Sequence, residues 1–227
     1  MKHKLKMCLI TSISVLFVVL IVFIISRALS GELKKDFAKL TGSKSEKEEE
    51  TTVTDSFLLS DTIDRQFLTI NPNSRPGTAL KKVNAVVVHY VGNPGTTASQ
   101  NRSYFEGLKD SKDPNVGASS HYIIGLEGEI IQCVPLEEIS YASNNRNKDT
   151  VAIECCHEDA TGKFNEKTYS SLVKLTAALL KTYGLSVETG LIRHYDVTKK
   201  ECPLYYVKNE DEWYGFKLAV EAAMKAE

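Results

Sequence analysis

Hydrophobic residues follow two alternating kinds of segment along the chain, and this alternation is typical of an α/β fold. The short apolar runs at 83–90 (VNAVVVHY) and 150–156 (TVAIECC) predict buried strands. Between them, the segment 119–136 (SSHYIIGLEGEIIQCVPL) predicts a hairpin that turns near Glu127 and Gly128. The strands should therefore lie close together in one sheet.

Helix signals stand after the first predicted strand. Thr97 offers a capping box with Gln100, and the helix that it opens carries Phe105 and Leu108 on one side. A helix placed between strands is what an α/β fold requires.

The C-terminal part of the chain repeats this order. Asn165 can cap a second helix, and Gly184 suits the C-terminal end of that helix. The run GLIRH at 190–194 then predicts a strand, and 210–225 predicts a last helix. Apolar residues recur at helical spacing after Asn165, which indicates a core-facing stripe: Leu172, Leu175, Leu179 and Tyr183.

The N-terminal residues have a different composition. Residues 8–25 form 18 positions without a charge, preceded by a lysine-rich segment at 1–7. At 1.5 Å per residue, such a helix is just long enough to cross a hydrocarbon core of about 30 Å with flanking help. We therefore expect a single transmembrane anchor in the cell membrane, with 1–7 in the cytoplasm and the later residues outside. A cleaved signal peptide, which would release a secreted protein, is the alternative.

Residues 26–55 are rich in charges of both signs and lack apolar periodicity, so they predict a flexible linker. Residues 56–227 remain as one folded domain with enough apolar content for a sizeable core. The formal net charge of −1, without a clustered basic face, argues against a nucleic-acid partner. The sequence leaves the oligomeric state open.

Three residues that can bind zinc stand at or just beyond strand-like segments: His89, His194 and Cys202. Two imidazoles and one thiolate can hold zinc and leave its fourth position open, which is the ligand count of a hydrolytic site. A lone histidine at a strand end is more often an ordinary polar group, but two histidines with a cysteine favour a metal. Pro203 fixes the chain just after the thiol.

The remaining cysteines after residue 30 are Cys133, Cys155 and Cys156. If Cys202 binds zinc, at least one of these three thiols must stay unpaired. The hairpin strand with Cys133 could lie beside Cys155 or Cys156, which would allow one disulfide bridge.

Four segments together resemble the zinc-dependent N-acetylmuramoyl-L-alanine amidases, the family of phage lysozyme-type amidases and peptidoglycan recognition proteins. They read AVVVHYVGNPGTTA, SSHYIIGLEGEIIQCVP, DTVAIECCH and RHYDVTKKECP, and the resemblance covers roughly residues 67–207. It implies a central mixed β-sheet flanked by helices, with zinc in a cleft at the sheet edge. It also implies peptidoglycan as the substrate, cleaved at the amide between the muramic acid lactyl group and L-alanine.

The resemblance also assigns residues. His89, His194 and Cys202 match the zinc ligands of the family, Glu154 matches a catalytic glutamate, and Lys200 matches a catalytic lysine. The chemistry agrees, because a carboxylate can move the proton of the attacking water and an ammonium group can stabilise an oxyanion. Lys199 adjoins Lys200, and either lysine could instead be solvated.

One position departs from the family pattern. The phage-type enzymes carry a catalytic tyrosine immediately before the histidine of the hairpin strand, and here Ser120 stands before His121. Either Glu154 replaces the function of that tyrosine, or catalysis is weak. A peptidoglycan-binding receptor without catalysis is an alternative function, because recognition proteins of the same fold can bind muropeptide without cutting it. A metallohydrolase for another amide or ester is a third.

Other polar residues near the matched segments have open roles. His121 and His157 match no ligand position, and His121 is expected to pack or to line the substrate site. Asp196 could accept the second ring N–H of His194 or could cap a loop. The polar loop 144–147 (NNRN) could hydrogen-bond the stem peptide or glycan, or form an ordinary turn.

Overall fold

The computed structural model describes residues 56–113 and 115–226 of the chain. The predicted membrane anchor at 8–25 and the predicted linker at 26–55 lie outside these residues. Within the described residues, no helix combines the length and the apolar character needed to cross a membrane.

The described residues form one mixed six-stranded sheet with the strand order β1-β4-β3-β5-β2-β6. Neighbouring strands are parallel except for β3 and β4, which form the antiparallel hairpin expected from the sequence. The strands are β1 (Ile63–Arg65), β2 (Ala85–Tyr90), β3 (Tyr122–Ile124), β4 (Ile130–Gln132), β5 (Thr150–Cys155) and β6 (Leu191–Arg193).

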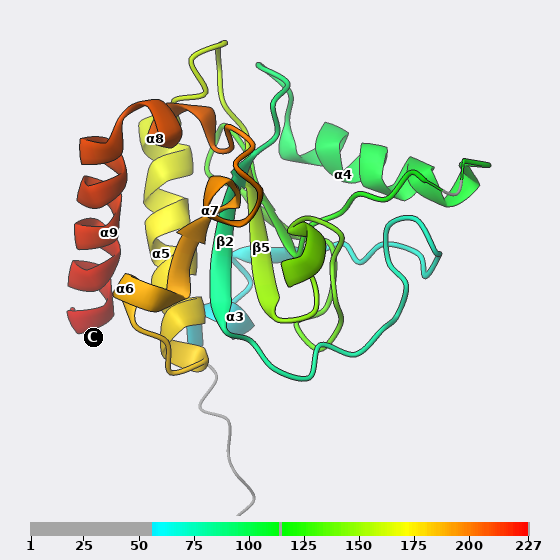
Figure 1. Ribbon diagram of the computed structural model, residues 1–227, viewed down its shortest axis with the longest axis horizontal. Helices are drawn as coiled ribbons and strands as arrows, with labels where there is room; N and C mark the ends of the chain where they lie inside the picture. Colours follow the sequence, from blue (N-terminus) through cyan, green and yellow to red (C-terminus); the bar gives the residue numbers. More distant parts are fainter. Residues whose placement is uncertain (1–55, 114, 227) are drawn as a thin grey trace, which may run out of the picture. The chain divides into compact units, whose positions relative to one another are not determined.

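Helices cover both faces of this sheet, as expected for the predicted α/β class (Figure 1). The long helices α5 and α9 lie side by side on one face, and α4 lies on the other. The helices are α3 (Ser56–Leu59), α4 (Ala98–Gly107), α5 (Glu166–Thr182), α6 (Val187–Gly190), α7 (His194–Thr198), α8 (Leu204–Lys208) and α9 (Glu210–Lys225), with short 3₁₀ turns η1 (Leu108–Asp110) and η2 (Asn144–Arg146).

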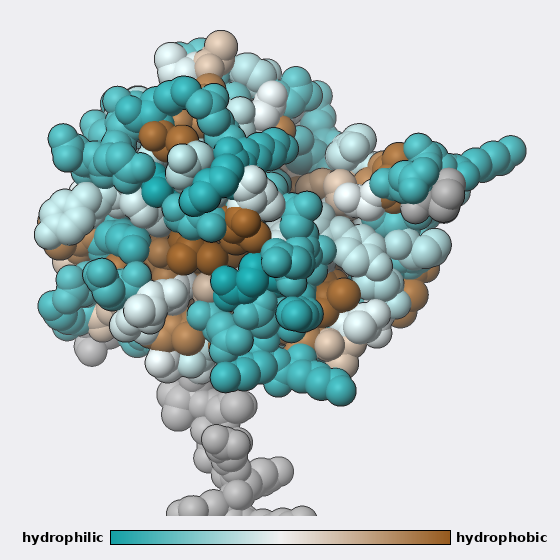
Figure 2. Space-filling view, in the orientation of Figure 1, coloured by the Kyte–Doolittle hydropathy of each residue, from teal (hydrophilic) through white to brown (hydrophobic). Residues whose placement is uncertain are grey.

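The two faces of the sheet have separate hydrophobic clusters. The larger cluster packs β2 and β5 against α5 and α9, and the smaller one packs Ile123 and Ile131 against Phe105 of α4. From outside, hydrophilic residues dominate the face drawn in Figure 2, and apolar residues appear there as separate patches. The apolar surface is thus gathered between the layers, where its removal from water stabilises the fold.

Side-chain alternation along the central strands decides which residues face α4. Val88 on β2 and Ile153 on β5 belong to the α5 cluster, so their neighbours His89 and Glu154 point to the opposite face. His89 is also the register partner of Glu154. The fold therefore places an imidazole and a carboxylate side by side at the C-terminal ends of two parallel strands.

The predicted helix caps are present. The Thr97 hydroxyl accepts from the Gln100 backbone N–H, and the Gln100 side chain accepts in return from Thr97. Asn165 Oδ1 accepts from the Thr168 backbone N–H at 2.9 Å. Gly184 ends this second helix with a positive φ of 61°, a conformation that glycine adopts without steric cost.

Two sequence expectations need correction. The strand predicted at 190–194 ends at Arg193, because Asp196 accepts a hydrogen bond from the Arg193 backbone N–H and starts α7 at His194. The suggested disulfide is absent, since all four cysteines in the described residues are free. Cys133 and Cys155 belong to clusters on opposite faces of the sheet, so a bond between them would have to pass through it. Cys133 and Cys156 share the smaller cluster, and both are free thiols there.

The carboxylate of Glu106 on helix α4 bonds to the loop after β1, which Arg102 of the same helix also contacts. Glu106 accepts from the backbone and hydroxyl of Thr69 at 3.0 and 2.7 Å, and from Lys109 at 2.9 Å. The hydrogen bond from Lys109 and those from Thr69 lower the pKa of Glu106 to about 2. This contribution to stability is complete above the ordinary carboxyl pKa and is lost as the pH falls toward 2.

We therefore expect Glu106→Gln to lower the free energy of unfolding at pH 7 by about 1–2 kcal/mol, with the difference shrinking toward zero near pH 2. Thermal unfolding of the full chain at both pH values measures it. Glu127→Gln is the matched control, because Glu127 makes an exposed ion pair with Lys167. An equal effect of Glu106→Gln at both pH values would contradict the prediction.

Candidate metal centre

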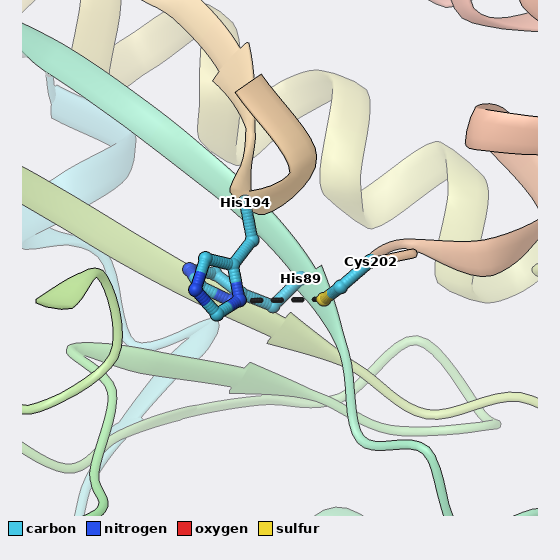
Figure 3. A group of neighbouring side chains, drawn as sticks. All are labelled: His89, His194 and Cys202. Atoms are coloured by element: carbon cyan, nitrogen blue, oxygen red, sulfur yellow. Dashed lines mark hydrogen bonds between the residues drawn. The ribbon is translucent and has the colours of Figure 1, made fainter. Parts of the chain in front are cut away.

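The structure brings together His89, His194 and Cys202 from three separate segments (Figure 3). His89 lies near the end of β2, His194 is the first residue of α7, and Cys202 lies in the loop before α8. One ligand atom from each side chain falls within 4.8 Å of the others, and all three residues are buried. The three side chains are therefore in reach of a single ion.

Hydrogen bonds leave one nitrogen of each imidazole facing this cluster. His89 Nδ1 lies 3.8 Å from Cys202 Sγ, and His89 Nε2 lies 3.3 Å from the Ser143 hydroxyl. His194 Nε2 lies 3.0 Å from Asn144 Oδ1. Since an amide oxygen only accepts, His194 Nε2 carries the proton and its Nδ1 keeps a free lone pair.

These atoms fit a zinc ion. Bonds of about 2.1 Å to nitrogen and 2.3 Å to sulfur in a tetrahedral site place the ligand atoms roughly 3.6 Å apart, close to the separation of His89 Nδ1 and Cys202 Sγ. Two nitrogens and one sulfur are also a donor set that zinc prefers. An ion held by these three ligand atoms would have a fourth position for water or substrate.

Burial shifts the pKa values of all three side chains, and these shifts decide which of them must lose a proton before a metal binds. It lowers the pKa of His89 well below its usual value and also lowers that of His194, and the positive charge of Lys200 adds to both effects. The imidazoles are therefore neutral, which is the form that binds a metal. Burial raises the pKa of Cys202 to about 12, so the thiol must release its proton when a metal binds.

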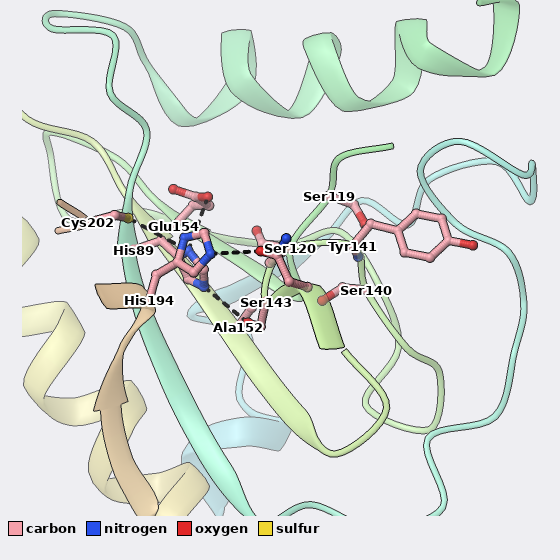
Figure 4. Close-up of polar contacts among 12 residues, drawn as sticks. His89, Ser119, Ser120, Ser140, Tyr141, Ser143, Ala152, Glu154, His194 and Cys202 are labelled. Atoms are coloured by element: carbon pink, nitrogen blue, oxygen red, sulfur yellow. Dashed lines mark hydrogen bonds and ion pairs between the residues drawn. The ribbon is translucent and has the colours of Figure 1, made fainter. Parts of the chain in front are cut away.

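Glu154 lies beside this cluster (Figure 4). Its Oε1 is 3.9 Å from His89 Nδ1, the nitrogen that faces the thiol. Its Oε2 is buried without a hydrogen-bond partner, although 17 % of the side chain as a whole is exposed. Burial raises the pKa of Glu154 to about 8, against the opposing effect of Lys200. A carboxyl group kept in this costly environment has the proton affinity that acid–base chemistry needs.

The two adjacent lysines are distinguished by their contacts. Lys199 Nζ lies 5.0 Å from the centre of the Tyr195 ring, which is a cation–π contact. Lys200 is exposed, and its charge lowers the pKa of His89, His194 and Glu154. Lys200 is thus the lysine whose field acts on the site.

Ser120 and His121 are both fully buried structural residues. The Ser120 hydroxyl donates to the Tyr122 carbonyl oxygen at 2.7 Å, so it does not stand in for a tyrosine that faces a metal. The His121 ring is held on both sides, because Nε2 donates to the Glu138 carbonyl at 2.9 Å and Nδ1 accepts from the Ala152 N–H at 3.0 Å. The expected packing role of His121 agrees with these contacts.

His157 and Asp196 also lie outside the cluster. His157 Nδ1 donates to the Asp159 carbonyl oxygen at 2.7 Å, and its ring packs on Tyr90. Asp196 binds the backbone and guanidinium of Arg193, while the second ring nitrogen of His194 contacts Asn144 instead. Of the two roles open to Asp196, the structure shows the capping one.

A polar pocket of about 370 Å³ borders the cluster through Asn144. Its lining combines amide side chains with one aromatic ring, which suits a neutral ligand that offers hydrogen-bond donors and acceptors. The lining residues are Pro72, Asn115, Val116, Gly117, Tyr141, Ala142, Asn144 and Asn147.

Sequence reasoning missed the contacts of Ser143 and Asn144 with the two imidazoles. The polar loop that contains Asn144 is visible in the sequence, but its pattern alone predicts only a substrate-binding loop or an ordinary turn. The contacts join residues 54 and 50 positions apart, so no local pattern could reveal them.

A cluster of two histidines and one cysteine, next to a largely buried carboxyl group at the C-terminal ends of the interior strands β2 and β5, is typical of metal-dependent hydrolases. Residues 79–204, more than half of the chain, match the family described as N-acetylmuramoyl-L-alanine amidase. The chain therefore belongs to this family, as the four sequence segments indicated.

Curated relatives agree with this assignment. The chain is 31% identical over 172 residues to a probable N-acetylmuramoyl-L-alanine amidase of Bacillus licheniformis, which covers 70% of this chain and 47% of the relative. It is 30% identical over 178 residues to the N-acetylmuramoyl-L-alanine amidase BlyA of Bacillus subtilis strain 168, with 70% of this chain and 46% of the relative covered. The chain thus spans about half the length of the curated relatives it matches.

Solved structures show the same fold. The catalytic domain of XlyA matches with a TM-score of 0.57 at 25% identity, over 70% of this chain and 98% of that domain. A mutant endolysin from Bacillus subtilis matches with a TM-score of 0.57 at 26% identity, over 70% of this chain and 97% of the other. The central mixed sheet with flanking helices is therefore the fold of endolysin amidase domains.

Proposed function

We propose that this protein is a zinc-dependent peptidoglycan hydrolase that cleaves the amide between the lactyl group of N-acetylmuramic acid and L-alanine. One observation carries the proposal: His89, His194 and Cys202 converge beside the buried carboxyl group of Glu154 in a chain of the amidase family. The names of the curated relatives support the same substrate bond.

The residues divide the chemistry between them. Zinc, when bound by the three ligands, supplies a Lewis acid that polarises the amide carbonyl and makes water more acidic. Glu154 accepts the proton of the attacking water at its carboxylate and passes it to the nitrogen of L-alanine as the C–N bond breaks. Lys200 stabilises the negative charge that develops on the carbonyl oxygen.

The test is a digest of purified peptidoglycan by the full chain in detergent, with and without a zinc chelator. We expect newly freed N-terminal alanine without new reducing sugar, and we expect the chelator to abolish it and added zinc to restore it. Release of reducing sugar would instead indicate cleavage of the glycan, and preference for simple peptides would indicate a general metallopeptidase.

A peptidoglycan-binding receptor of the same fold is the second candidate, favoured by the Ser120 hydroxyl, which is occupied by the Tyr122 carbonyl. It predicts binding of peptidoglycan without any freed alanine, although the protein is folded and loaded with zinc. The presence of all three ligand side chains and of Glu154 favours the enzyme.

The location of the domain is also a proposal and rests on the apolar segment 8–25. A single-pass anchor would hold the hydrolase outside the cytoplasm on the side of the cell wall, where peptidoglycan lies. Recovery of the full-length protein mainly from culture fluid would contradict this placement.

A further inference from the structure

One short turn contacts both imidazoles of the cluster on the sides that face away from Cys202. The Ser143 hydroxyl lies 3.3 Å from His89 Nε2, and Asn144 Oδ1 lies 3.0 Å from His194 Nε2. Ser143 is fully buried, and Asn144 begins the 3₁₀ turn η2. Two consecutive residues therefore hold the outer nitrogens of two rings that come from different elements.

The turn has its own internal support. Asn147 Oδ1 accepts from the backbone N–H groups of Ala142 and Ser143 at 3.1 and 2.6 Å. Arg146 Nε donates to Asp149 at 2.8 Å and closes the other side of the turn. The positions of the two contact residues are thus fixed by bonds that do not involve the histidines.

The backbone of Asn144 has a left-handed conformation with φ of 52°. Asparagine tolerates this region better than other residues with a side chain, whereas glycine adopts it freely. A glycine here would keep the turn and lose only the amide group. Asn144 therefore combines a conformation that few residues accept with a hydrogen bond to a cluster residue.

We propose that Ser143 and Asn144 are positioning residues that hold both imidazoles in the Nε2–H tautomer, with Nδ1 directed to the metal position. Asn144 Oδ1 can only accept, so it stabilises a proton on His194 Nε2. The Ser143 hydroxyl can accept in the same way from His89 Nε2. A rotated ring would set a C–H group against either oxygen and lose the hydrogen bond.

This inference rests on the proposed zinc site, and it concerns metal affinity before any step of catalysis. Partners of metal-binding histidines typically change affinity by 10–100-fold, because they fix the ring orientation and raise the basicity of the free nitrogen. A ring that must first change tautomer or rotate binds zinc less tightly, because only a fraction of the molecules then has the ring in the form that binds the metal.

The experiment measures zinc affinity of the full chain in detergent by competition with a chromogenic chelator. We expect Ser143→Ala and Asn144→Gly each to weaken zinc binding by about 10–100-fold, and the double variant to weaken it further. Asn144→Asp keeps an acceptor and should bind zinc at least as tightly as the wild type. Asn145→Gly, at the exposed neighbouring position of the turn, is the matched control and should leave the affinity unchanged.

A second readout needs no metal. Long-range ¹H–¹⁵N spectra of the zinc-free chain should show the Nε2–H tautomer for both histidines in the wild type and a mixture of tautomers in the double variant. Thermal unfolding checks that each variant is folded, and Asn144→Gly provides the decisive comparison if the double variant is not.

The outcomes separate this inference from the proposed function. Wild-type zinc affinity in Asn144→Gly and Ser143→Ala would overturn the inference while leaving the zinc site intact. A wild-type chain that binds no zinc would overturn the proposed function, and the tautomer spectra would still decide whether the turn orients the rings.

Discussion

Replacing Glu154 by glutamine is expected to reduce peptidoglycan turnover by about 10²–10⁴-fold while zinc remains bound, which is the usual size of a general acid–base contribution. Glutamine has nearly the same shape as glutamate but cannot take up a proton and pass it on. The three proposed metal ligands are unchanged in this variant. The loss should therefore appear in the rate of amide cleavage and leave zinc affinity nearly as it was.

The same substitution should not destabilise the zinc-free chain. Burial raises the pKa of Glu154 to about 8, so ionising this carboxyl group opposes folding. The sign follows from linkage: stability is highest below the ordinary carboxyl pKa and falls as the pH rises toward 8. The glutamine of the Glu154→Gln variant has no charge to bury. The difference in thermal unfolding temperature between the variant and the wild type should therefore increase in favour of the variant from pH 5 to pH 8.

Glu201→Gln is the matched control for both measurements. Glu201 precedes Cys202 in the same loop, but its side chain is 52% exposed and pairs with Lys208. Its replacement should leave turnover close to that of the wild type. If Glu154→Gln digests peptidoglycan at the wild-type rate, Glu154 has no part in the mechanism and the open position of the metal must be served by another group.

The parts of the site that could be predicted from sequence are those set by local chain pattern. Short, continuously apolar runs predict where the buried strands β2 and β5 lie, and the in-register pairing of these parallel strands then brings His89 next to Glu154. Helix caps at Thr97 and Asn165 depend on contacts three residues away, so they too could be found. The resemblance to the amidase family predicts the combination of the three proposed metal ligands.

The parts that could not be predicted depend on contacts between distant segments. The start of α7 at His194 requires the Asp196 cap, which competes with continuation of the strand. Whether Cys133 and Cys155 lie on the same face of the sheet depends on the register of their segments, because a shift of one residue moves a side chain to the other face. The contacts of Ser143 and Asn144 depend on where a loop returns to His89 at the end of β2 and His194 at the start of α7, which no periodic pattern encodes.

Replacing Cys202 by serine is expected to weaken zinc binding by more than about 100-fold, because even the outer partners of metal ligands are worth 10–100-fold. A serine hydroxyl is a much poorer ligand than a thiolate for a metal that prefers sulfur and imidazole nitrogen. Activity at limiting zinc should fall by a similar factor. Equilibrium competition with a chelator measures the affinity, and the peptidoglycan digest measures the activity at each free zinc concentration.

Cys156→Ser is the control that isolates the metal from the general effect of losing a buried thiol. Cys156 is equally buried, and its sulfur lies 3.6 Å from Asn101 Nδ2, a donor that a serine oxygen can also accept. Cys156 lies outside the His-His-Cys cluster, so the Cys156→Ser variant should bind zinc with the affinity of the wild type. Loss of zinc binding in both variants would indicate a disturbed fold. Unchanged zinc binding in Cys202→Ser would show that the thiol is not a ligand, and a residue other than Cys202 would then have to complete the site with the two histidines.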